Sequence, residues 1–152
     1  MRKAISTEKA PRSLGPYSQA IQVGQTLYLS GQLGIEPSSG KLAEGGAAAQ
    51  ARQALLNIQA LVSAAGFSMQ EIVQVQIFLA DMNDFTAVNE VYRTFFQEPF
   101  PARAAVQVSG LPSGGRIEIL AVAQKEAPTM NVQRRHPSVV RRTEHPYTEE
   151  YF

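Results

Sequence analysis

Two charged residues of opposite sign, Arg103 and Glu118, lie within an otherwise mostly apolar stretch that runs from Phe100 to Gln124. The stretch is typical of two strands joined by a Gly/Pro loop, and its apolar alternation predicts that both charges sit in a mostly buried sheet. Buried charges are costly unless they are paired or bind a ligand. A fixed guanidinium matches a carboxylate in a two-pronged geometry, and a carboxylate in apolar surroundings can act as acid or base. A structural ion pair and a small-carboxylate site are both compatible with this pattern.

Three further positions are candidates for a pocket, and each has a plainer explanation. Tyr17 follows a Gly-Pro turn, where it either contacts a ligand or is a partly buried loop aromatic. Ser30 and Gly31 end a strand-like run, and glycine there permits close approach by a ligand or by another strand. Asn89 lies in the middle of a predicted helix, where solvent exposure is the usual explanation for asparagine.

The composition narrows the chemistry available. The chain has 152 residues, 44% of them hydrophobic and 18% charged, which suits one globular domain with a real core. It has no cysteine, and its two histidines lie near the C-terminus, which disfavours thiol chemistry, a histidine triad or a metal site in the folded body. No apolar run is long enough to span a membrane and no secretory leader is evident, so we expect a cytoplasmic protein.

The pattern of apolar residues predicts an α+β domain of order β-β-β-α-β-α-β-β with a mostly antiparallel sheet. The expected strands are 2–7, 18–23, 26–30 and 73–79 and two within 100–124, and the expected helices are 47–65 and 84–96. Residues 32–46 are expected to form a loop.

The faces of these elements can also be predicted. In the first helix, Gln50 and Asn57 are assigned to the solvent side, and Gly66 is expected to cap the C-terminus. In the strand 73–79, Val73 is placed on the same inward face as Val75. Asp84 is the expected N-cap of the second helix.

The last strand is apolar on both sides, although two helices can cover only one face of the sheet. Another subunit is the obvious cover for the second face, so we expect a homo-oligomer. The domain is assigned to residues 1–126 and a C-terminal extension to residues 127–152. The extension lacks apolar periodicity and is interpreted as irregular, solvated and dispensable for catalysis, although its four arginines also allow anion binding.

Several motifs together resemble the Rid proteins, the reactive intermediate (enamine/imine) deaminases also called YjgF-type. They are Gly15-Pro16-Tyr17-Ser18-Gln19-Ala20, Leu29-Ser30-Gly31-Gln32, Asp81-Met82-Asn83-Asp84-Phe85, Val88-Asn89, Phe100-Pro101-Ala102-Arg103 and Arg116-Ile117-Glu118-Ile119. The resemblance covers about residues 3–126, and the C-terminal extension falls outside it.

The resemblance implies a chorismate-mutase-like fold assembled as a homotrimer, with clefts between subunits. It implies a cofactor-independent enzyme that hydrolyses 2-iminobutanoate, 2-iminopropanoate and enamines such as 2-aminoacrylate to 2-keto acids and ammonia. Arg103 matches the arginine that holds the substrate carboxylate, and Glu118 matches the glutamate that positions the attacking water. The other matched pocket positions are Tyr17, Ser30, Gly31, Asn89 and Ala105. Many bacterial members have a cysteine where this chain has Ala105, and the family role there belongs to the backbone carbonyl.

Two other functions remain open. The same clefts could bind small carboxylates as a regulatory module without turnover. Some family members are described as ribonucleases or translation inhibitors, but residues 1–126 contain ten Lys/Arg and ten Asp/Glu, a balance that does not favour nucleic acid as a partner.

Overall fold

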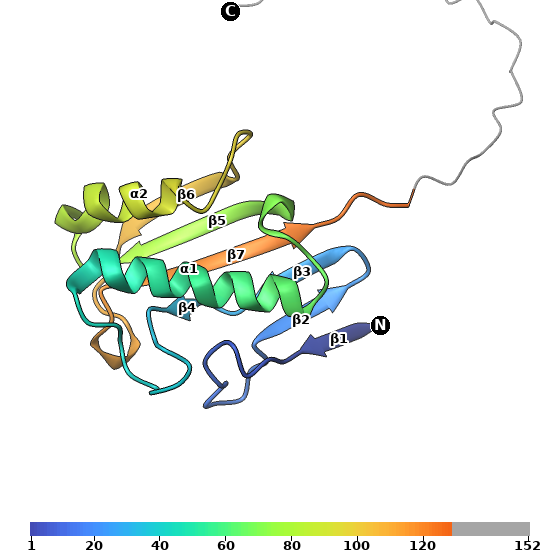
Figure 1. The fold of residues 1–152 in the computed structure, drawn as a ribbon, viewed down its shortest axis with the longest axis horizontal. Coiled ribbons are helices and arrows are strands. Elements are labelled where there is room, and N and C mark those ends of the chain that lie inside the picture. The colour runs from blue at the N-terminus through green and yellow to red at the C-terminus, as the bar shows by residue number, and fades with distance from the viewer. Residues whose placement is uncertain (129–152) are drawn as a thin grey trace, which may run out of the picture.

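The fold is a single mixed sheet with two helices in front of it, seen in a computed structural model that describes residues 1–128 (Figure 1). The strands are β1 (Arg2–Ile5), β2 (Ala20–Val23), β3 (Thr26–Leu29), β4 (Gln32–Leu33), β5 (Ile72–Leu79), β6 (Ala102–Gln107) and β7 (Ile117–Gln124). The helices are α1 (Gly46–Ala64) and α2 (Phe85–Arg93), with short 3-10 turns η1 (Met69–Glu71), η2 (Met82–Asp84) and η3 (Pro112–Gly114). The strand order is β1-β2-β3-β7-β5-β6, with β4 also paired to β7. Only β5 and β6 pair in parallel, so the predicted α+β, mostly antiparallel architecture is confirmed.

The core lies between the sheet and the helices. Alternate residues of β5 and β7 point toward α1 and are almost fully buried, as period-two alternation requires. The main contributors on the two sides are Val75, Ile77, Leu79, Ile117, Ile119, Ala121, Ala123, Ala51, Ala54, Leu55, Ile58, Leu61 and Val62. Gly66, with φ +75°, ends the helical segment as expected, because its N–H bonds to the Ser63 carbonyl.

The structure adds a strand that the sequence analysis missed. Residues 32–46 were expected to be a loop, but Gln32 and Leu33 pair with Ile119 and Glu118 of β7. β3 pairs with the C-terminal part of the same β7 edge, so Ser30 and Gly31 form a break between two short ladders. Two residues are too few for hydrophobic periodicity to reveal, which explains the error.

The structure corrects three predictions about the ends of strands and helices. A β-bulge between Ile72 and Gln74 turns Ile72 inward and leaves Val73 45% exposed, because a bulge inserts one residue and reverses the alternation. Asp84 does occupy the N-cap position of α2, but its side chain makes no capping hydrogen bond there. Its carboxylate instead accepts hydrogen bonds from Nε and Nη2 of Arg116 at 2.8–3.0 Å. The second helix also ends at Arg93, earlier than expected.

The solvent face assigned to α1 is wrong at Gln50 and Asn57. Gln50 is 7% exposed and Asn57 is fully buried, and both make hydrogen bonds to backbone outside the helix. Periodicity treats every amide side chain as polar and therefore outward, but a buried amide is stable where it satisfies backbone groups.

The opposite face of the sheet is left uncovered by any described residue. Tyr28 and Val106 are 52% and 47% exposed there, and Phe78, Leu120 and Val122 are partly buried beside them. The doubly apolar character of β7 is therefore confirmed, with Ile117, Ile119 and their neighbours facing the helices. Within residues 1–128, no helix is long and apolar enough to cross a membrane.

Candidate functional site

Glu118 and Gly31 line a cavity of about 640 Å³. β7 carries Glu118 on the face away from the helices, paired with Phe78 on one side and with Leu33 on the other. An ideal Cβ placed on Gly31 would lie 2.5 Å from Oε1 of Glu118, so only glycine leaves the carboxylate its observed position. The close approach expected at Gly31 thus involves a side chain of β7.

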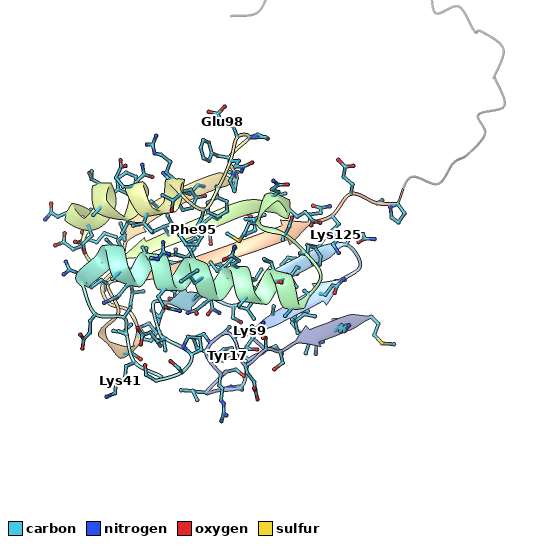
Figure 2. The ribbon with its side chains drawn as sticks, in the orientation of Figure 1. Lys9, Tyr17, Lys41, Phe95, Glu98 and Lys125 are labelled. Atoms are coloured by element: carbon cyan, nitrogen blue, oxygen red, sulfur yellow. The ribbon has the colours of Figure 1, made fainter. Side chains whose placement is uncertain are left out.

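Tyr17 and Ser30 line the same cavity. Figure 2 shows Tyr17 at the lower edge of the view, on the loop between β1 and β2. The hydroxyl of Ser30 donates to the Ser18 carbonyl at 2.6 Å, and the Ser30 N–H donates to the Gln19 carbonyl at 3.0 Å. These two hydrogen bonds therefore link Ser30, between β3 and β4, to the loop that carries Tyr17.

Gln19 is a structural support of this loop that the sequence analysis missed. Its side chain is 6% exposed, and its Nε2 donates to carbonyls of Thr7, Ala10 and Pro11 at 2.7–3.3 Å. Its Oε1 accepts from the Thr7 N–H at 2.8 Å. One buried amide thus replaces the backbone pairing that a loop lacks. The only signal in the sequence was its place within the Gly15–Ala20 motif.

Asn57 and Gln50 of α1 support the floor of the cavity. Nδ2 of Asn57 donates to the carbonyls of Leu33 and Ile35, at 3.3 and 2.9 Å. Oε1 of Gln50 accepts from the N–H of Arg116, at 2.8 Å, just before β7 begins. These bonds fix two backbone segments next to the site: residues 33–35, which follow Gly31, and Arg116, which precedes Glu118.

The environment of Glu118 suits a base that retains its proton more strongly than an exposed carboxyl. Burial raises the pKa of the Glu118 carboxyl above its ordinary value. Among residues 1–128, the one ion pair joins Arg116 and Asp84, so no described cation stabilises the Glu118 carboxylate. In that range, no three His, Cys, Asp or Glu side chains gather where they could hold a metal ion.

Arg103 and Asn89 lie together at a second cavity of about 410 Å³, bounded by α2 and the start of β6. Nη1 of Arg103 donates to Oδ1 of Asn89 at 2.7 Å. The guanidinium carbon lies 4.6 Å from the centroid of the Tyr92 ring and 5.6 Å from that of Phe85. Arg103 is exposed in the single chain, so its prediction as a buried charge is wrong here: β6 is the edge strand and has a neighbour on one side only.

The structure separates the two charges that the sequence analysis considered as a pair. In register, Arg103 lies beside the inward-facing Val75, whereas Glu118 lies beside Phe78 on the other face. The sheet therefore stands between them, and no Arg103–Glu118 ion pair exists among the described residues. The two cavities also lie toward different edges of the sheet: in Figure 2, Tyr17 is low in the view and Glu98, on the loop before β6, is at the top. Ala105 pairs with Ile77 and packs against the core, outside both cavities.

A sequence model of the family described as "Endoribonuclease L-PSP" matches residues 7–125. The chain belongs to this family. The bovine (Bos taurus) protein named 2-iminobutanoate/2-iminopropanoate deaminase is 55% identical over 123 residues, which cover 81% of this chain and 90% of that protein. The crystal structure of RidA from an Antarctic Psychrobacter is 47% identical, with a TM-score of 0.78 over 81% of this chain and 99% of that one. Escherichia coli TdcF, solved with bound serine, is 39% identical, with a TM-score of 0.78 over 82% of this chain and 99% of that one.

These comparisons confirm the resemblance to the Rid proteins. The family match stops at Gln124-Lys125, directly after β7. The division into residues 1–126 and 127–152 stays a prediction, and nearly all of the C-terminal extension lies outside the described residues.

Proposed function

We propose that this protein hydrolyses 2-imino acids, formed from enamines such as 2-aminoacrylate, to 2-keto acids and ammonia. The observation that carries the proposal is the pair of cavities, one built around an oriented guanidinium and the other around a carboxylate with a raised pKa. Relatives at 55% and 54% identity are named deaminases of this kind, and the chain covers about nine-tenths of each.

In this function, Arg103 binds the substrate carboxylate through parallel hydrogen bonds. A protonated imine carbon is already electrophilic, so the reaction requires an aimed water and a base rather than a covalent nucleophile. Glu118 accepts a proton as the water attacks and returns it to the amine nitrogen of the resulting carbinolamine. The C–N bond then breaks to release ammonia, and the hydroxyl group loses its proton to become the keto group. Neither a metal nor an organic cofactor is required for these steps.

Arg103 and Glu118 project from opposite faces of one sheet, so one substrate molecule contacts both only if they come from different chains. The uncovered apolar face offers the surface for such an assembly, with Tyr28, Val106 and Leu120 in it. The assembly is a homotrimer in which the Arg103 cavity of one subunit meets the Glu118 cavity of its neighbour. Tyr17, Ser30 and Gly31, which line the Glu118 cavity, complete the pocket around the substrate. The side chain of Ala105 packs against the core, so only its backbone carbonyl, on the edge strand β6, is proposed to contribute.

The assembly is tested by sedimentation equilibrium at micromolar protein, where a trimer is expected. The substitution Val106→Asp places a charge on the uncovered face and is expected to dissociate it, since a buried unpaired charge is costly. A folded, monomeric parent protein with full activity would contradict the assembly.

The reaction is tested by a coupled assay in which a dehydratase generates 2-aminoacrylate and release of the keto acid is timed. Glu118→Gln preserves the shape of the side chain and removes the base, so hydrolysis should fall by about a hundredfold or more while 2-ketobutyrate still binds. Arg103→Ala should weaken both, because the arginine contacts the ligand before and during reaction. Arg52→Ala, on the helix α1, is the matched arginine control and should match the parent.

Two alternatives make different predictions in the same experiments. If the parent protein binds 2-ketobutyrate but gives no acceleration, the protein is a small-carboxylate-binding module. If the parent protein cleaves RNA and Glu118→Gln has no effect on keto-acid release, the protein is better described as a ribonuclease, the activity in the family's description.

A further inference from the structure

Arg103 lies on an exposed edge strand, where an arginine side chain normally samples many rotamers. Binding a carboxylate through two parallel hydrogen bonds requires one orientation of the guanidinium. If the arginine side chain moves freely before binding, the conformational entropy that it loses weakens the affinity for the carboxylate. The contacts around Arg103 show how that loss is avoided.

Three side chains on one face of α2 surround the guanidinium. Phe85, Asn89 and Tyr92 follow each other at intervals of four and three residues, which places them on the same side of a helix. The side-chain oxygen Oδ1 of Asn89 accepts a hydrogen bond from Nη1 of Arg103, at 2.7 Å. The Tyr92 ring lies under the guanidinium, with 4.6 Å between the ring centroid and the guanidinium carbon. This distance is well within the range of cation–π attraction.

The Tyr92 ring is itself rigidly held, and its hydroxyl is not what holds it. Tyr92 is 4% exposed and its ring lies 4.5 Å from that of Phe96. Its hydroxyl is a buried polar atom without a hydrogen-bond partner among residues 1–128. Burial raises the pKa of this hydroxyl despite the nearby Arg103, so the ring stays a neutral phenol. The aromatic face is therefore the part of Tyr92 that interacts with Arg103.

We propose that Tyr92 and Asn89 are positioning residues that fix the guanidinium of Arg103 before the substrate arrives. This role rests on the proposed function of Arg103 in binding the substrate carboxylate. Asn89 takes up one N–H of Nη1, and the Tyr92 ring covers one face of the planar group. The edge formed by Nε and Nη2 keeps two parallel N–H donors, the arrangement that a carboxylate matches. Asn89 thus acts through Arg103 rather than as a direct contact of the substrate.

The first test compares two substitutions of Tyr92. Tyr92→Phe keeps the aromatic face and removes only the unpartnered hydroxyl, so the Kd for 2-ketobutyrate should stay within about twofold of the parent value. Tyr92→Leu keeps an apolar side chain but removes the ring, and should raise both that Kd and the KM for 2-aminoacrylate by about fivefold or more. The kcat should change much less, because the orientation of Arg103 matters equally before and during reaction.

The control is Phe67→Leu, which removes a buried aromatic ring that lies under Lys125 rather than under Arg103. It should lower stability with little effect on the Kd. In an Arg103→Ala background, Tyr92→Leu should have no further effect on binding, because the residue acts through the arginine. Should Tyr92→Leu fail to fold, Asn89→Ala replaces it, since Asn89 is only partly buried.

The second test follows the arginine directly and needs no turnover. The ¹⁵N relaxation of the Arg103 Nε–Hε group should show an ordered side chain in the ligand-free parent and in Tyr92→Phe. The order should fall in Tyr92→Leu and Asn89→Ala. Equal order in all four proteins would overturn the positioning role even if the parent is an active deaminase. Loss of order in the variants, with a parent that neither binds keto acid nor hydrolyses imine, would leave the positioning intact and overturn the proposed function alone.

Discussion

The substitution Gly31→Ala tests how strongly hydrolysis depends on the position of the Glu118 carboxylate, because the new methyl group would displace that carboxylate. The new methyl carbon would lie 2.5 Å from Oε1 and 3.0 Å from the carboxyl carbon of Glu118, whereas ordinary contact begins at 3.4 Å. The carboxylate must therefore move by about 1 Å, and a misplacement of this size costs about a hundredfold in rate. That factor corresponds to about 2.7 kcal/mol of transition-state stabilisation.

The fold should tolerate this substitution. Gly31 has no positive φ, so alanine meets no backbone strain there, and the atoms that must move are at the end of a side chain. Gly110→Ala is the matched control, because Gly110 also lacks a positive φ and a Cβ there would meet nothing within 4 Å. We expect both variants to unfold at denaturant concentrations close to that of the parent.

The assay is dehydratase-coupled release of keto acid, measured alongside calorimetric binding of 2-ketobutyrate. Gly31→Ala should hydrolyse about a hundredfold more slowly, and Gly110→Ala should match the parent. A double-mutant cycle shows whether the fall in rate arises from displacement of the Glu118 carboxylate. If it does, Gly31→Ala should lower the rate much less in a Glu118→Gln background than in the parent. Parent-like hydrolysis by Gly31→Ala would refute this reasoning. Lost keto-acid binding would show instead that the methyl group blocks the substrate.

Two further predictions concern the stability of the folded protein. Asn57→Ala leaves the part-buried carbonyls of Leu33 and Ile35 without these hydrogen bonds, so the free energy of unfolding should fall by about 1–3 kcal/mol in denaturant titrations; Gln59→Ala, on the same helix, is the control. Glu118 binds its proton more tightly in the folded state, so ionisation of the carboxyl destabilises the folded protein as pH rises through the window between its unfolded and folded pKa values. The stability of Glu118→Gln relative to the parent should therefore increase with pH through that window, and a difference independent of pH would contradict the assignment.

Hydrophobic periodicity was sufficient to predict both helices, the long strands and the apolar second face of β7, because each involves several residues repeating on one side. It failed at β4, at the Ile72 bulge and at Asn57, where the outcome depends on a tertiary partner. Asn57 is polar and buried only because two carbonyls of the segment 33–35 need donors. No local pattern carries that information.

The candidate residues divide in the same way. Arg103 and Glu118 were identified from their chemical types within an apolar stretch, but their burial was overestimated and their separation was not foreseen. Which face of the sheet each residue takes depends on register, and one residue of shift reverses it. The supports from α1 were missed because they bind backbone near the Glu118 cavity. Asn89 of α2 was identified as a pocket candidate, but its hydrogen bond to Arg103 was not foreseen.

The separation of the two charges yields a test by subunit mixing. Arg103→Ala and Glu118→Gln are each expected to be nearly inactive as pure proteins. If each cleft takes Arg103 from one subunit and Glu118 from its neighbour, unfolding and refolding an equal mixture gives an intact pair in about one quarter of clefts. The mixture should therefore recover about a quarter of parent activity. Arg103→Ala mixed with the double variant should recover none, because no subunit then carries Arg103. If both groups of a working site came from one chain, no mixture of the single variants would regain activity, since every chain lacks one of them.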